Sequence, residues 1–188
     1  IKLAKCKGGG WTKSDLVEYD MAFSNPRNMR EELHTFKVEI FDSLDELPED
    51  ERELVLTAED ALKSAYAPYS HFRVGAAVSL KTGGFLNIYT GNNQENASFT
   101  GSHAERVALD GLARESEKSG LDKIAITSDS PEPVTPCGSC RQDIKEYEDL
   151  AGAPITILMA GSRGKVWRVL GIDALLPLAF GPANLCKI

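Results

Sequence analysis

At 188 residues, with 42% hydrophobic residues and 7% aromatic ones, the chain has the length and composition of one globular domain with or without an appendage. Its formal net charge of −7 argues against a nucleic acid polymer as partner, because phosphate-binding proteins gain much of their affinity from clustered Lys and Arg. No apolar run approaches the roughly 18–20 residues of a membrane-spanning helix, so we expect no membrane partner and a cytoplasmic location.

The first 35 residues differ in pattern from the rest of the chain. They contain a run of three glycines and no lasting hydrophobic period, which predicts an N-terminal extension over residues 1–35 and a main domain over residues 36–188. The main domain opens with an alternation of Phe36, Val38 and Ile40, which predicts a strand. Pro48 and the three acidic residues after it predict the start of a helix that continues to Ala65.

Further elements follow in regular order. Strands are predicted at 74–80 and 85–89, joined by a turn at 81–84, and again at 124–127, 154–159 and 165–170. Helices are predicted from His103 to about Lys118, from Pro136 onward, and briefly around Leu175 and Leu176. This alternation of strands and helices predicts an α/β layered fold with a mixed sheet.

Two of the four cysteines are spaced for metal or redox chemistry. Cys137 and Cys140 lie two residues apart at a predicted helix start, where the helix dipole and free N–H groups favour thiolates. By itself this spacing is compatible with a redox pair, a structural zinc site or a catalytic one. Cys6 and Cys186 have no partner pattern and are interpreted as bystander thiols.

The histidines favour a catalytic metal site over a structural one. A closed structural zinc site needs four protein ligands, and the sequence offers no second Cys pair or His pair. His103 is the best third ligand, because Glu105 follows it at a spacing that suits a general acid/base beside an activated water. His-x-Glu followed by Pro-Cys-x-x-Cys is the signature of zinc nucleobase deaminases, in which the Glu carries protons and does not bind the metal. His34 and His71 are interpreted as ordinary surface or hydrogen-bonded histidines.

Additional segments strengthen this interpretation, and with them the chain resembles the cytidine deaminase family over roughly residues 37–185. The segments are Ser64–Ala77, Gly91–Ser98, His103–Arg106, Pro136–Gln142, Leu176–Pro177 and Phe180–Pro182. The resemblance implies a three-layer α/β/α fold with a mixed central sheet of about five strands and one Zn²⁺ per subunit. It also implies hydrolytic deamination of cytidine and 2′-deoxycytidine, as in pyrimidine salvage, by a homotetramer or homodimer.

The resemblance assigns roles to substrate-binding residues. Asn93 and Glu95 are expected to hold the ribose hydroxyls, which an amide and a carboxylate can pair in a fixed geometry. Phe72 is expected to pack on the pyrimidine ring, although a core aromatic residue is the alternative. The Ala104 backbone N–H is expected to bind the base carbonyl, and the Thr135 carbonyl to accept the leaving amine.

Three further residues are given supporting roles by the same resemblance. Phe180 is expected to reach a neighbouring subunit's site, with burial in its own core as the alternative. Arg106 and Arg141 lie close to the predicted ligands and are expected to offset the charge of the thiolates. For Arg106, an ion pair on the helix surface remains the alternative. The stretch between Glu95 and His103 is slightly shorter than in compact relatives, so the loop on the substrate side is expected to differ.

Other functions remain open at this point. One is a deaminase of another amino-pyrimidine, such as blasticidin S or a free base, which would share the zinc motif but for which the segment around Asn93 and Glu95 is less suited. A polynucleotide deaminase is disfavoured by the negative charge. A zinc-stabilised binding module without activity is disfavoured by Glu105 and by the open fourth position.

Overall fold

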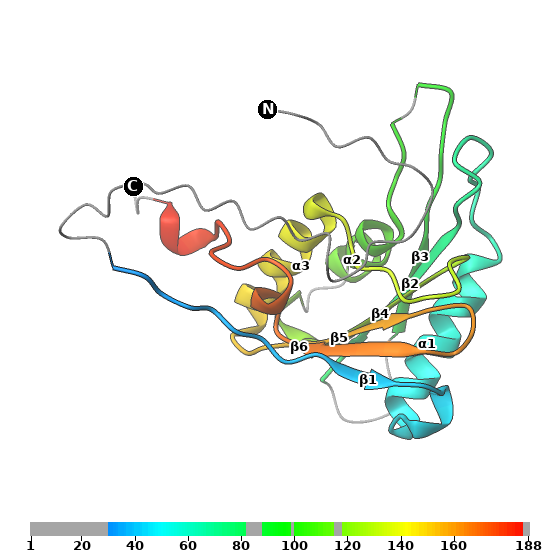
Figure 1. Ribbon diagram of the computed structural model, residues 1–188. Coiled ribbons are helices and arrows are strands. Elements are labelled where there is room, and N and C mark those ends of the chain that lie inside the picture. The colour runs from blue at the N-terminus through cyan, green and yellow to red at the C-terminus, as the bar shows by residue number, and fades with distance from the viewer. Residues whose placement is uncertain (1–29, 82–87, 99, 115–117, 186–188) are drawn as a thin grey trace, which may run out of the picture. The chain divides into compact units, whose positions relative to one another are not determined.

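The computed structural model describes residues 30–81, 88–98, 100–114 and 118–185, and the part from His34 onward forms one compact unit. Three α-helices and six strands are found in these residues (Figure 1): α1 Glu49–Leu62, α2 Ala104–Arg114 and α3 Gly138–Ala151; β1 Glu39–Phe41, β2 Val74–Leu80, β3 Ile88–Asn92, β4 Leu121–Ser128, β5 Thr156–Ala160 and β6 Val166–Leu170. No helix in the described ranges is long and apolar enough to cross a membrane. Most of the predicted extension 1–35, together with Cys6 and Cys186, lies outside the described residues, and that domain division stays a prediction.

The six described strands form one mixed sheet in the order β1-β6-β5-β4-β2-β3. Only β4 and β5 are parallel, and every other neighbouring pair is antiparallel. The mixed sheet is confirmed, with six strands where about five were expected. The strand at one edge, β1, pairs with β6 through three residues and precedes the first helix.

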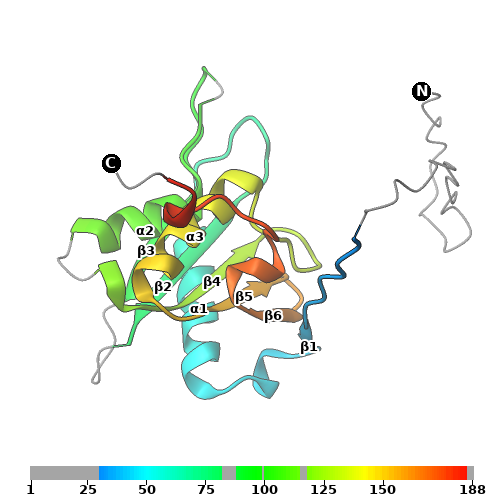
Figure 2. The ribbon, with the colours of Figure 1, turned by 90° about the vertical axis from the view of Figure 1, so that its left-hand side faces the viewer.

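Helices cover both faces of this sheet (Figures 1 and 2). α1 packs on one face, where Leu54, Val55 and Ala58 meet alternate side chains of the central strands. α2 and α3 pack on the other face, where they bury the larger core cluster. Six of the seven residues of β2 are buried because the strand is covered on both sides, as in the centre of an α/β sheet. The three-layer α/β/α architecture is therefore confirmed.

Three predicted elements differ in detail. The first strand covers Glu39–Phe41, so that Phe36 and Val38 precede it, and Ile40 within it is 59% exposed. The alternation predicts a strand, and the structure places a short one at the edge of the sheet, where Ile40 is exposed while Phe41 packs partly buried against the core cluster under α1. The return strand of the hairpin starts at Ile88, and the turn after Lys81 lies outside the described residues. The last predicted helix is a single 3-10 turn, Ile172–Ala174, that ends before Leu175 and Leu176.

One arginine ties the edge strand to the rest of the fold. Arg168 on β6 donates from Nε to Glu39 Oε2 of β1 at 2.6 Å and from Nη1 to Glu51 Oε2 of α1 at 2.8 Å. Its guanidinium also stacks over the Phe41 ring, 4.9 Å from the centroid. The Glu51 residue is only 7% exposed, so its carboxylate depends on this partner.

We therefore expect the substitution Arg168→Met to lower the free energy of unfolding by about 1–3 kcal/mol, because it leaves the buried Glu51 carboxylate without its charge partner. The matched control is Lys165→Met, whose partner Glu132 has a 60% exposed side chain. That change is expected to cost less than about 1 kcal/mol. Urea unfolding of the two variants measures the difference, and equal losses would contradict the role given to Arg168.

Candidate metal centre and active site

The strand directions bring the two halves of the predicted motif to one edge of the sheet. β3 and β4 are both antiparallel to β2, so they run in the same direction and their carboxyl ends lie at the same edge. The loop after β3 leads into α2, and the loop after β4 leads into α3. The start of β2 lies between them at this edge. His103, immediately before α2, and Cys137, at the N-cap of α3, are therefore neighbours although 34 residues separate them.

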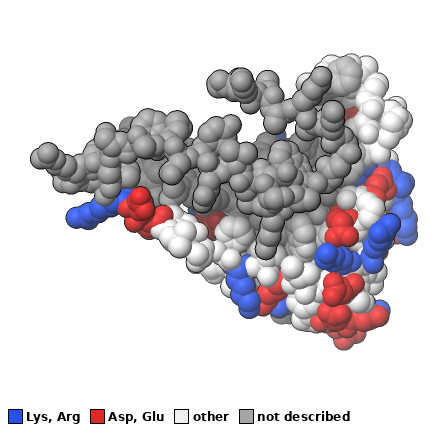
Figure 3. Space-filling model, in the orientation of Figure 1, with Lys and Arg blue, Asp and Glu red and all other residues white. Residues whose placement is uncertain are grey.

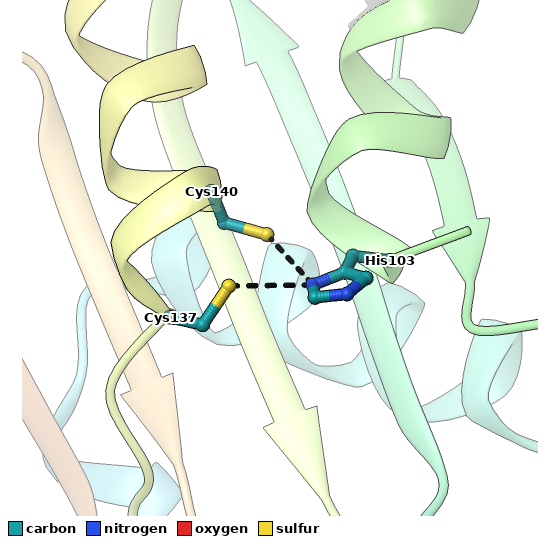
Figure 4. Close-up of side chains that lie close together, drawn as sticks. All are labelled: His103, Cys137 and Cys140. Atoms are coloured by element: carbon teal, nitrogen blue, oxygen red, sulfur yellow. Dashed lines mark hydrogen bonds between the residues drawn. The ribbon is translucent and has the colours of Figure 1, made fainter. Parts of the chain in front are cut away.

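The three predicted ligands form one cluster (Figure 4). The Nδ1 atom of His103 lies 3.3 Å from the Sγ atom of Cys137 and 3.3 Å from that of Cys140, and all three ligand atoms lie within 4.8 Å of one another. Around a tetrahedral zinc ion, a nitrogen ligand and a sulfur ligand are about 3.6 Å apart, given bonds near 2.1 and 2.3 Å. The cluster therefore has the donor types and nearly the spacing that Zn²⁺ requires.

Charge in this cluster also favours a bound cation. Cys140 is buried, and burial together with the nearby Glu105 charge raises the pKa of its thiol. Two thiolates and a carboxylate crowded at this position are unfavourable without a compensating charge. A divalent cation would supply that charge and would deprotonate the thiols. Residues His103, Cys137 and Cys140 thus fit zinc by geometry and by chemistry.

Glu105 lies beside the ligands. It is the second residue of α2 and is 5% exposed. It lines a cavity of about 280 Å³ together with His103 and Cys137. A buried carboxylate that faces a cavity next to metal ligands is suited to general acid/base chemistry.

Most of the other predicted substrate residues line the same cavity. Phe72, Asn93, Ala104 and Thr135 all contribute to its wall, and Phe72 is 39% exposed and so is not a core residue of the described chain. Glu95 lines a second cavity of about 340 Å³, which shares Ser70, Asn93 and His103 with the first. The two cavities therefore adjoin: Cys137 and Glu105 line only the first and Glu95 lines only the second. The individual roles of these residues stay predictions.

Asn93 and Glu95 also organise the segment before β2. Asn93 accepts a bond from the Val74 N–H at its Oδ1 and donates from Nδ2 to the Phe72 carbonyl, both at 2.8 Å. Glu95 Oε2 accepts bonds from the backbone N–H groups of Tyr69 and Ser70, at 2.8 and 3.1 Å. A hydrogen bond from the Ser70 side chain, followed by these backbone bonds, lowers the pKa of Glu95. Both side chains therefore help to hold Phe72 at the cavity.

The supporting residues are placed differently from one another. Arg141 donates to the carbonyls of Pro136 and Leu175, both at 2.7 Å, and to Thr135 Oγ1 at 2.8 Å, so it fixes the loop that precedes Cys137. Arg106 forms an ion pair with Asp143 on α3. The Phe180 side chain is 57% exposed, and its carbonyl accepts a bond from Gln142. Burial of Phe180 in the core of the described chain is thus ruled out.

An ion pair at the edge of the site was not foreseen. Arg73 donates from Nε and Nη2 to the two oxygens of Asp129, at 3.0 and 2.9 Å, and its backbone N–H also bonds to Asp129. Arg73 lies in the segment Ser64–Ala77, but Asp129, 56 positions away, belongs to none of the resembling segments. Only the pairing of β2 with β4 brings them together. The pair fixes the chain next to Phe72 against the loop that leads to the cysteines.

This pair should make stability depend on pH. The hydrogen bonds from Arg73 lower the pKa of Asp129 below its ordinary value of 3.8. Because the folded-state pKa is depressed, the pair stabilises the fold above the unfolded-state pKa, and this contribution is lost as the pH falls through the folded-state pKa. We expect the substitution Asp129→Asn to lower the free energy of unfolding at pH 6 more than at pH 3, measured by urea unfolding. An equal difference at both pH values would contradict this.

A three-layer α/β/α fold with a His–Cys–Cys cluster and a buried carboxylate beside it defines a zinc-dependent hydrolase of the deaminase class. Residues 48–151 match the family described as the cytidine and deoxycytidylate deaminase zinc-binding region, which includes His103, Glu105, Cys137 and Cys140. The chain belongs to the cytidine deaminase family.

Individual relatives agree with this assignment. The chain is 36% identical over 132 residues to the cytidine deaminase of Halalkalibacterium halodurans, which covers 70% of this chain and 94% of the relative. It is 32% identical to that of Sporosarcina psychrophila over 72% and 95% of the two chains. Among solved structures, the cytidine deaminase of Burkholderia pseudomallei superposes with a TM-score of 0.60 at 35% identity and covers 68% of this chain and 97% of that one.

Proposed function

We propose that this enzyme deaminates cytidine and 2′-deoxycytidine by hydrolysis, to uridine and 2′-deoxyuridine plus ammonia, within pyrimidine salvage. The observation that carries the proposal is that Glu105 lines one cavity together with His103 and Cys137, two members of the His103–Cys137–Cys140 cluster. Two relatives that align with this chain over most of their own length are named cytidine deaminases, which supports cytidine as the substrate.

The chain's own residues account for the proton transfers. When bound by His103, Cys137 and Cys140, zinc supplies a Lewis acid that lowers the pKa of a water to about 7. Glu105 takes a proton from the attacking water and delivers it to N3 of the pyrimidine, which makes C4 electrophilic. The hydroxide that remains adds to C4, Glu105 carries the proton of the new C4 hydroxyl group to the amino group, and ammonia leaves as the C4 carbonyl forms. Because Glu105 is buried, its carboxylate is held at the reacting atoms and shielded from bulk water.

The cavity walls suit a cytosine ring. Phe72 supplies an aromatic face for stacking. Ala104 is the first residue of α2, where backbone N–H groups have no partner within the helix and can donate to the base carbonyl. The Thr135 carbonyl can accept from the amino group. Asn93 and Glu95 already bond to backbone groups of residues 69–74. They would bind the ribose hydroxyls through the donor and acceptor positions that these bonds leave free.

The charge of the walls favours a nucleoside over a nucleotide. Among the described residues that line the two cavities, the ionisable groups are Glu95, Glu105, His103, Cys137 and Tyr69, with neither Lys nor Arg. A 5′-phosphate would meet acidic groups without a cation to pair with. A nucleic acid strand is disfavoured for the same reason, and Figure 3 shows acidic and basic side chains interspersed on the described part of one face.

Assembly and location are part of the proposal. We propose a homotetramer or homodimer in which the exposed Phe180 side chain reaches a neighbouring subunit's site. This role is supported by the contact that Gln142 makes with the Phe180 carbonyl, which fixes the backbone there while the aromatic ring stays exposed. A cytoplasmic location suits the site, because reducing conditions keep Cys137 and Cys140 available as thiolate ligands.

The proposal is tested by following the ultraviolet absorbance of cytidine, deoxycytidine, cytosine, blasticidin S and dCMP with the purified protein. We expect turnover of the two nucleosides, much slower turnover of the others, and loss of activity in a chelator that returns with Zn²⁺. Preference for cytosine or blasticidin S would replace the proposed substrate. A protein that holds zinc but turns over none of the five would instead be a zinc-stabilised binding module.

A further inference from the structure

Polar contacts join α2 and α3, the helices at whose starts the metal ligands lie. Arg106 on α2 donates from Nε to Asp143 Oδ2 at 2.9 Å, and from Nη2 to Oδ1 and Oδ2 at 2.8 and 2.7 Å. Further along, the Tyr147 hydroxyl of α3 donates to the Leu109 carbonyl of α2 at 3.0 Å. The first contact is a two-oxygen pair of an arginine with a carboxylate, which fixes direction as well as distance.

The Arg106–Asp143 pair lies next to the catalytic elements. Arg106 follows Glu105 directly and lies three residues after His103, while Asp143 lies three residues after Cys140. The pair therefore connects the first turn of α2 to the first turns of α3. Arg106 Nη2 also donates to the Ser139 hydroxyl, between the two cysteines, at 3.3 Å.

The partners are too exposed for the pair to matter much to global stability. Their side chains are 51% and 26% exposed, and ion pairs of this kind contribute about 0–1 kcal/mol to folding. Positional precision at a site is a different quantity, because a displacement near 1 Å can cost orders of magnitude in function. A contact that contributes little to the free energy of folding can therefore still have a large effect on metal binding at the site.

We propose that Asp143 is a positioning residue for the metal centre. By holding Arg106, it fixes the first turn of α2, with His103 and Glu105, against the first turn of α3, with Cys137 and Cys140. The ligands then stand at binding distance before the ion arrives, and the ion does not have to draw the two helices together. This inference rests on the zinc centre of the proposed function.

The test measures zinc affinity by competition with a chromophoric chelator under reducing conditions. We expect the substitution Asp143→Asn, which keeps the shape and loses the charge, to weaken zinc binding about 3- to 10-fold. This is less than the 10–100-fold typical of a partner that bonds a ligand directly. The conservative change Asp143→Glu should recover most of the affinity. The control Asp149→Asn removes an acid from the same helix whose partner is Lys145, and it should change the affinity less than twofold.

A second comparison shows whether Asp143 acts through Arg106. In an Arg106→Gln background, the change Asp143→Asn should have almost no further effect on zinc affinity. The thermal midpoint of the zinc-free protein should fall by only a degree or two in each variant. Wild-type affinity in Asp143→Asn, an equal loss in the control, or a full loss in the Arg106→Gln background would overturn the proposal. The affinities need no substrate, so failure of cytidine turnover would remove the proposed function alone, whereas a wild-type protein that binds no zinc would overturn both.

Discussion

Replacing Glu105 by Gln is expected to lower the deamination rate by at least ~10²–10⁴-fold while zinc stays bound. Glutamine keeps the size and the hydrogen-bonding reach of the side chain but cannot accept and return a proton. The reaction needs that transfer twice, once to N3 and once to the amino group. Because Glu105 is buried at the cavity wall, solvent cannot easily replace it as the proton carrier. His103, Cys137 and Cys140 are untouched, so the metal should remain.

The measurement is kcat for cytidine together with the zinc content of the same sample. The matched control is Asp110→Asn, an exposed acid on the same helix, for which we expect turnover within about twofold of wild type. Near-normal turnover in Glu105→Gln with zinc present would show that another group moves the protons. A zinc-free Glu105→Gln protein would mean that the carboxylate also helps to hold the metal.

The metal centre was largely predictable because its signals are local. Cys137 and Cys140 are two residues apart, and Glu105 follows His103 at fixed spacing, so one helix start holds each half. Each half was predicted at the start of a helix, and the strands before these helices, β3 and β4, run in the same direction and so bring the halves together. The layered architecture was predictable for a similar reason, since hydrophobic period distinguishes strands from helices.

The contacts that organise the site were not predictable, because each depends on a pairing between distant positions. Arg73 meets Asp129 across 56 residues, and Arg106 meets Asp143 across 37. Charged residues of this kind look the same in sequence whether they are solvated or paired. The position of β1 at the edge of the sheet was not predictable for a related reason, since alternation indicates a strand but not which neighbours cover it.

A close backbone approach, also invisible in the sequence, leads to the second large effect. Gly91 on β3 lies under the first turn of α2, so close that a Cβ atom there would stand 2.3 Å from the Ala104 carbonyl oxygen and 2.5 Å from the Ala108 nitrogen. Real Cβ atoms do not approach backbone so closely. The obstructing atoms belong to helix backbone and cannot turn away as a side chain would. An added methyl group must therefore displace α2 from the sheet.

We expect the substitution Gly91→Ala to lower the free energy of unfolding by about 1–3 kcal/mol or more. It should also reduce kcat by about 10²-fold, because Ala104 stands between His103 and Glu105 and the displaced turn carries both away from the cysteines. The control is Gly111→Ala, within α2 itself, where the new Cβ would make ordinary contact with the Tyr89 side chain at 3.5 Å. That change should stabilise the protein by about 0.5–1 kcal/mol, since alanine replaces glycine in a helix interior. Urea unfolding and cytidine turnover are measured for both variants. Unchanged stability in Gly91→Ala would mean that α2 and β3 are not in such close contact. Lost stability with normal turnover would mean that the position of this turn does not limit catalysis.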